Sequence, residues 1–112
     1  MSNSTISIQS TNNDTIVKFV SSSIIINGGS HEFNNIDEAK NAPLAQQLFH
    51  LPFVKKVFIT ANFIAIQKYD IVEWEEVQEE IREQIEAYLN AGSTIINATE
   101  KKQAIEVYAE VT

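Results

Sequence analysis

The sequence predicts an α+β fold, in which a mostly antiparallel sheet carries two helices on one face. Two observations predict it. Short segments rich in β-branched and aromatic residues follow one another with turn formers between them, as hairpin-connected strands do. Two segments with helical spacing of apolar residues stand apart from these strands, a short one that begins at Pro43 and a long one over residues 70–91.

Two strands joined by a turn are expected at the start of the chain. Residues 5–10 alternate between apolar and polar, which indicates a half-buried strand. Residues 15–20 form the next strand, with Val17 and Phe19 on its more apolar face. The segment between them, residues 11–14, is a run of turn formers.

A third short strand is expected at the apolar triplet 24–26, which the Asn-Gly-Gly that follows would stop. Residues 31–33 offer a place where strand pairing resumes. Either Asn34 or Asn35 is placed to cap a short turn through residues 36–40, because an Asn side chain can accept from the backbone N–H groups that open a turn.

The central stretch predicts a short helix and then a hairpin. Pro43 suits a first helical position, where its missing N–H would have no partner, and Pro52 ends the helix. Residues 54–60 and 63–69 have strand composition. A tight turn is expected between them, since Asn62 tolerates positive φ. The short helix has one apolar face, made by Leu44, Ala45, Leu48 and Phe49.

The clearest helix in the sequence covers residues 70–91. Asp70 lies three residues before Glu73, an acidic variant of the capping box, and Tyr69 and Trp74 then occupy the two positions of a hydrophobic staple. Apolar residues recur along this helix at spacings of three and four, and they form one apolar stripe: Trp74, Val77, Ile81, Ile85, Tyr88 and Leu89.

Gly92 stands where a C-cap glycine belongs. The opposite side of the long helix carries Arg82 among many glutamates, so its stability must come from packing of the stripe. Those glutamates are Glu75, Glu76, Glu79, Glu80, Glu83 and Glu86.

Charge and composition exclude several classes of protein. The 112 residues carry a net charge of -7 and contain no Cys. An acidic chain is a poor general binder of nucleic acid or of anionic lipid. Without Cys it has no disulfide, no thiolate nucleophile and no thiolate ligand for a metal cluster. The sequence shows no apolar leader and no membrane-length apolar run, so a cytoplasmic location is expected.

Candidate chemistry in the sequence is sparse, and we predict no catalytic, cofactor-binding or metal site. The two histidines, His31 and His50, lie in different elements, and His50 suits the C-terminal end of the short helix. Gly28-Gly29 fits a plain turn better than a phosphate loop, because no Lys completes that motif. Ser21–Ser23 indicates a linker, and the glutamate face a solvated surface. Two aromatic residues beside turns are singled out for exposure, Phe53 and Phe63.

An ordered set of short motifs resembles the N-terminal domain of Nfu-type (NifU-like) iron–sulfur scaffold proteins. The chain departs from that family at the turn 11–14, usually Thr-Pro-Asn-Pro, at Ala42, often Ser, and at Phe53, often Gly. The motifs are VKF at 17–19, EF at 32–33, Ala39, PLA at 43–45, LF at 48–49, VKKVF at 54–58, NFIAIQK at 62–68 and Trp74.

The resemblance implies that this chain is the non-cluster-binding module of an iron–sulfur cluster assembly or carrier protein. It implies no enzyme activity and no cofactor in this chain, because in that family a Cys-x-x-Cys motif in a separate domain of a longer parent holds the cluster. It implies iron–sulfur assembly or acceptor proteins as partners. The alternative, from the residues alone, is a small ligand-binding or metal-dependent enzymatic domain that uses His and Glu residues.

The end of the sequence indicates a boundary. We expect a domain over residues 1–92, then a polar linker that leads into a strand-like segment at 105–111. That segment loosely repeats the first strand, so residues 93–112 are interpreted as a linker and the possible first strand of a following repeat module.

Overall fold

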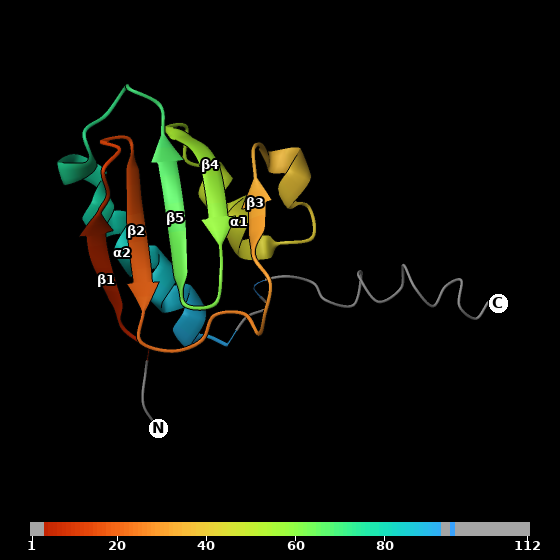
Figure 1. Cartoon of the computed structure of the whole chain (residues 1–112). Coiled ribbons are helices and arrows are strands. Elements are labelled where there is room, and N and C mark those ends of the chain that lie inside the picture. Colours follow the sequence, from red (N-terminus) through yellow and green to blue (C-terminus); the bar gives the residue numbers. More distant parts are fainter. Residues whose placement is uncertain (1–3, 93–94, 96–112) are drawn as a thin grey trace.

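A computed structural model describes residues 4–92 and residue 95, and it has the predicted α+β architecture (Figure 1). The described residues form one antiparallel sheet in the order β1-β2-β5-β4-β3, and the helices cover one face of it. The strands are β1 (Ile6–Ser10), β2 (Ile16–Ser21), β3 (His31–Phe33), β4 (Val54–Ile59) and β5 (Phe63–Lys68). The helices are the 3-10 helix η1 (Ile36–Ala39), α1 (Pro43–Phe49) and α2 (Trp74–Asn90).

The two predicted hairpins are confirmed, and the fold joins them through their inner strands. β1 pairs with β2 and β4 pairs with β5, each across a short connection. β5 then pairs with β2, which lies more than 40 positions earlier in the chain, with Phe19 opposite Ile64. This pairing puts the apolar faces of both hairpins on the same side, where the helices cover them.

The predicted strand at residues 24–26 is wrong. The backbone N–H groups of Ile25 and Ile26 both donate to the carbonyl oxygen of Ala61, at 2.6 and 3.4 Å, so this segment closes over the β4–β5 turn. The segment connects β2 to the far edge of the sheet, where β3 pairs with β4. Gly28 and Gly29 have φ of 108° and 75°, a backbone conformation that glycine adopts readily.

The β4–β5 turn is tight, as predicted, but it uses a different backbone conformation. The Thr60 N–H donates to the Phe63 carbonyl oxygen at 3.0 Å, which leaves Ala61 and Asn62 as the loop. Within the described residues positive φ occurs at glycines alone, so the expected positive φ at Asn62 is not adopted.

The short helices begin as their sequences predict. Asn35 caps η1, since its side-chain oxygen accepts from the Glu38 N–H at 2.9 Å. Pro43 opens α1 after Ala42, whose side chain makes no capping hydrogen bond, and His50 follows the last helical residue. The predicted apolar face of α1 is confirmed, with three residues buried and Phe49 partly buried.

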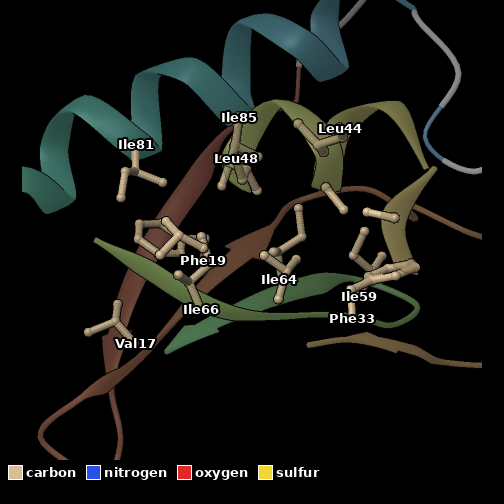
Figure 2. Packing of buried hydrophobic residues seen from close by; sticks show 14 of the residues in the cluster. Val17, Phe19, Phe33, Leu44, Leu48, Ile59, Ile64, Ile66, Ile81 and Ile85 are labelled. Carbon is tan, nitrogen blue, oxygen red and sulfur yellow. The ribbon is translucent and has the colours of Figure 1, made fainter. Parts of the chain in front are cut away.

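One hydrophobic core lies between the sheet and the helices (Figure 2). Alternation along β2 and β5 directs every second side chain into it, and the stripe of α2 closes it from the other side. The largest side chains that are fully buried are Phe19, Leu44, Leu48, Val57, Ile59, Ile64, Ile66, Ile81 and Ile85.

The long helix begins four residues later than predicted. Its N-cap is Glu73, and the Glu76 carboxylate accepts from the Glu73 N–H at 3.4 Å, so Asp70 is not the cap. The staple positions move with the cap to Val72 and Val77, which both pack against the core. Tyr69, the expected staple residue, is 48% exposed.

The revised start of α2 leads to a stability prediction. Replacing Glu76 by Ala removes the acceptor for the Glu73 N–H and a carboxylate near the positive end of the helix, so we expect a loss of about 0.5–1 kcal/mol. The matched variant Asp70→Ala should change stability by less than about 0.3 kcal/mol, since it lies outside the helix. Urea unfolding of both variants measures this. A larger loss of stability for Asp70→Ala than for Glu76→Ala would show that Asp70 is the N-cap, as the sequence predicted.

The C-terminal end of α2 has the predicted glycine. Gly92 adopts φ of 75°, and its N–H donates to the Leu89 carbonyl oxygen at 3.1 Å. Ile95, beyond it, is partly buried against the core. The predicted linker and strand lie, apart from this residue, outside the described residues.

Candidate functional site

The histidines do not form a site with each other. His31 lies in β3, at the edge of the sheet, where its ring stacks against Phe33 with 6.4 Å between centroids. His50 is exposed at the end of α1. Across residues 4–92 and 95 there is no group of three or more His, Cys, Asp or Glu residues that could hold a metal ion.

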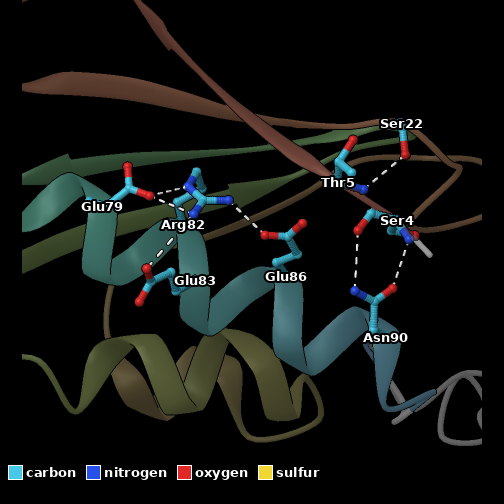
Figure 3. A network of polar contacts seen from close by, with 8 residues as sticks. All are labelled: Ser4, Thr5, Ser22, Glu79, Arg82, Glu83, Glu86 and Asn90. Atoms are coloured by element: carbon cyan, nitrogen blue, oxygen red, sulfur yellow. Dashed lines mark hydrogen bonds and ion pairs between the residues drawn. The ribbon is translucent and has the colours of Figure 1, made fainter.

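The acidic face of α2 is organised around its one arginine (Figure 3). Arg82 donates to Glu79 and to Glu86, both at 2.6 Å, and Glu83 lies 3.9 Å from it. The hydrogen bond with Glu79 is the main cause of a raised pKa of the guanidinium. Exposed pairs of this kind contribute little to stability, and the face remains strongly negative.

The opposite face of the sheet is the more distinctive surface. Within residues 4–92 and 95, helices cover one side of the sheet only (Figure 1). The side chains that alternate outward from β2, β4 and β5 are partly or fully exposed. We call the central group of these partly exposed residues the sheet-face patch: Lys18, Val20, Phe58, Phe63 and Ala65.

Strand register brings the sheet-face patch together. Lys18 is opposite Ala65, which is opposite Phe58, so one row crosses three strands, and Val20 is opposite Phe63 in the next row. The rings of Phe58 and Phe63 lie 6.1 Å apart at a tilt, and the Lys18 Nζ lies 4.6 Å from the centroid of Phe63. The patch is therefore an aromatic pair with a cation on it.

Charge divides between the two sides of the molecule. The glutamates of α2 face away from the sheet, whereas the sheet-face patch is flanked by Lys56, which pairs with Glu32 at 3.0 Å. Such a surface can bind apolar side chains of a partner, and Lys18 can pair with an acidic group next to those side chains. Partner binding is the chemistry that it supports.

Sequence reasoning located part of this surface. Phe63 was singled out for exposure and is partly exposed, but Phe53 is 8% exposed and belongs to the core, so that expectation is wrong. Phe53 lies just before β4, where its carbonyl oxygen accepts from the Tyr69 N–H at 2.8 Å, and its side chain packs in the core. Phe58 was missed, although its place between buried Val57 and Ile59 indicates the outer face.

Comparison with known proteins identifies the family. The family model described as "Scaffold protein Nfu/NifU N terminal" matches residues 6–92. The chain belongs to this family. The resemblance carried by the sequence motifs is thereby confirmed, and so is the fold that it implied.

Proteins from several eukaryotes are similar in sequence to this chain. The chain is 30% identical over 103 residues to "NFU1 iron-sulfur cluster scaffold homolog, mitochondrial" of Drosophila sechellia, a match over 91% of this chain and 36% of the relative. It is 28% identical over 90 residues to "NifU-like protein 4, mitochondrial" of Arabidopsis thaliana, over 80% of this chain and 32% of the relative. The chain thus spans about a third of the length of the curated relatives that it matches.

Two solved structures have the same fold as this chain. The solution structure of a NifU-like protein from Saccharomyces cerevisiae superposes with a TM-score of 0.71 at 30% identity, over 81% of this chain and 82% of that one. The crystal structure of protein SAV1430 from Staphylococcus aureus gives 0.62 at 23% identity, over 73% of this chain and 99% of that one, and shows the same fold.

The expected cytoplasmic location is corrected by these matches. The Drosophila and Arabidopsis relatives are named as mitochondrial proteins. The expectation depended on the lack of an apolar leader, and that feature bears on secretion, because mitochondrial targeting segments are amphipathic and rich in Arg and Ser. Within residues 4–92 and 95, no helix is long and apolar enough to cross a membrane.

The residues of this Nfu/NifU domain do not fit an iron–sulfur cluster. Such clusters are held by Cys thiolates, with His as an occasional substitute. The chain has no Cys, and its two histidines belong to different elements, β3 and the end of α1. No step in cluster chemistry can therefore be derived from these side chains.

Proposed function

We propose that the chain is the non-cluster-binding module of an iron–sulfur cluster assembly or carrier protein, and that it helps to recognise acceptor or delivery partners. Membership of the Nfu/NifU scaffold family supports the process. The absence of Cys supports the view that a separate cysteine-bearing domain of a longer parent protein holds the cluster. In this proposal the module itself is not an enzyme.

The observation that carries the proposal is the sheet-face patch. A monomeric domain usually covers paired aromatic side chains, and here Phe58 and Phe63 remain accessible beside a lysine. Lys18 favours a partner segment with an acidic residue next to its apolar side chains. The metal-dependent enzymatic alternative finds no support in the described part of the chain, where no metal-ligating group is present.

The domain boundary forms part of the proposal. Residues 1–92 make up the recognition module, which agrees with the extent of the family match, and residues 93–112 lead toward a following module. This chain covers about a third of the length of the relatives that it matches, which supports a longer parent protein.

Replacing Phe63 by Asp tests partner recognition. The change removes one ring of the aromatic pair and places a carboxylate next to Lys18, which it would neutralise. The sheet-face patch then loses both its apolar contact and its free cation, so affinity should fall at least about ten-fold. Isothermal titration of the full chain against apo forms of iron–sulfur acceptor proteins, and against a cluster delivery protein, measures the effect.

The matched control is Glu80→Gln, which alters charge on the exposed face of α2 and should leave the affinity unchanged. Circular dichroism confirms that both variants are folded. Equal affinity of Phe63→Asp and the parent chain for a partner that binds would remove the sheet-face patch from recognition. Binding of none of these partners would overturn the proposed role of the module.

A further inference from the structure

A cavity of about 420 Å³ opens at the end of the sheet beside the start of α2. It lies between the β1–β2 turn and the first turn of that helix, on the side of the sheet that the helices cover, away from the sheet-face patch. Its walls come from three parts of the chain, with Thr11 and Asn13 from the turn, Lys68 from β5, and Trp74 and Gln78 from α2.

Lys68 is the unusual residue of this cavity. It continues the inward alternation of Ile64 and Ile66 along β5, so its side chain lies on the helix side of the sheet and only 5% of the residue is exposed. Buried lysines are rare unless a counter-charge satisfies them. Among the described residues, Lys68 has no ion pair and no side-chain hydrogen bond.

Trp74 lines the same cavity and is itself buried. The residue is 6% exposed and packs edge-on against Phe19, yet its indole Nε1 has no hydrogen-bond partner. Buried indole N–H groups normally find an acceptor. The Nε1 atom itself has almost no accessible surface, so Lys68 is the group that a ligand in the cavity can contact.

The rim of the cavity has the opposite charge. Asp14, Glu73 and Glu75 line its opening, and all three are exposed. The cavity thus has a positive charge inside and negative charges at its opening. A ligand that complements it has one negative group that reaches the interior and positive groups that stay at the opening. A phosphate fits less well, because its second negative charge would face three carboxylates at the rim.

We propose that this cavity binds the side-chain carboxylate of a Glu or Asp in a partner polypeptide, where Lys or Arg residues flank that acid. A carboxylate oxygen accepts from the Lys68 ammonium, and the flanking cations face Asp14, Glu73 and Glu75. This assignment deepens the proposed role in partner recognition and depends on it for its biological meaning, but the binding itself is a property of this chain.

The test uses two peptides that differ in one group. The ¹⁵N-labelled full chain is titrated with acetyl-Ala-Lys-Glu-Lys-Ala-amide and with the same peptide carrying Gln in place of Glu. Trp74 is the one tryptophan in the sequence, so its indole N–H gives a single, unambiguous signal. We expect that signal to move to saturation with the Glu peptide, and the Gln peptide to bind at least about ten-fold more weakly.

Two lysine variants locate the effect. Lys68→Met keeps the length of the stem without the charge and should bring the Glu peptide down to the affinity of the Gln peptide. Lys40→Met, at an exposed lysine that follows η1 and does not line the cavity, should bind as the parent chain does. If Lys68→Met does not give the dispersed spectrum of a folded protein, the Glu and Gln peptides on the parent chain decide alone.

Three results would overturn the assignment: equal affinity for the two peptides, a Trp74 indole signal that stays in place, or tighter binding of inorganic phosphate than of the Glu peptide. Each is separable from the Phe63→Asp experiment, which measures whole protein partners on another face. Failure of the peptide titration leaves that result intact, and a carboxylate site would remain on the chain if the sheet-face patch bound none of the partners.

Discussion

Replacing Trp74 by Ala should lower the free energy of unfolding by about 3–5 kcal/mol. Trp74 is the first residue of α2, is 6% exposed and packs edge-on against Phe19 with 6.0 Å between ring centroids. Its removal leaves a large cavity where the helix begins to cover β2, and the backbone of both elements limits collapse into it. Urea unfolding followed by far-ultraviolet circular dichroism measures the change, since the variant has no tryptophan fluorescence.

Two controls separate packing from other causes. Trp74→Phe keeps an aromatic ring and removes the unpaired indole N–H, so it should lose much less stability than the Ala variant. Ile71→Ala, at a residue that is 66% exposed three positions earlier, should change stability by less than about 0.5 kcal/mol. A loss below about 1 kcal/mol for Trp74→Ala would show that the ring is not part of the core in solution.

Replacing Phe19 by Ala should have an effect of similar size, about 3–5 kcal/mol. Phe19 is fully buried in β2, and its ring fills the space between the sheet and the start of α2 (Figure 2). Its neighbour Lys18 points to the other face of the sheet, so Lys18→Ala is the matched control and should cost less than about 0.5 kcal/mol. Equal losses for the two variants would reverse the assignment of the faces of β2.

The two aromatic variants together form a double-mutant cycle. Because the Phe19 and Trp74 rings touch, their combined loss should differ from the sum by about 0.5–1.5 kcal/mol in favour of an interaction. A second cycle that combines Phe19→Ala with Ile85→Ala, a residue further along the apolar stripe of α2, gives a comparison within the same core. A coupling near zero for Phe19 and Trp74 would mean that the rings act independently.

The places where sequence reasoning failed share a cause. The triplet 24–26 has strand composition, but strand pairing needs a neighbour, and tertiary structure uses this segment to close the β4–β5 turn. The cap of α2 was placed at Asp70 because the acid-to-acid spacing fits there as well as at Glu73. Local patterns contain both options, and packing of Val72 and Trp74 against the core decides between them.

The candidate surfaces were harder to predict than the fold. Alternation shows that a strand has two faces, but it does not say which face a helix covers, so Phe58 was missed and Phe63 was singled out for exposure only because it flanks a turn. The cavity was not predicted at all. Lys68 ends a motif that resembles the family, and only the approach of α2 and the β1–β2 turn makes it part of a cavity that Trp74 also lines.

The sequence by itself determined the strands of both hairpins, the two helices and their buried stripes, because apolar periodicity and turn residues are local properties. It also determined that no thiolate is present, which depends on composition alone. Only the tertiary structure decided that β2 pairs with β5, that one face of the sheet stays open, and that Lys68 and Trp74 share a cavity. These features join residues far apart in the chain, and their free energy comes from contacts that exist only after the elements have packed.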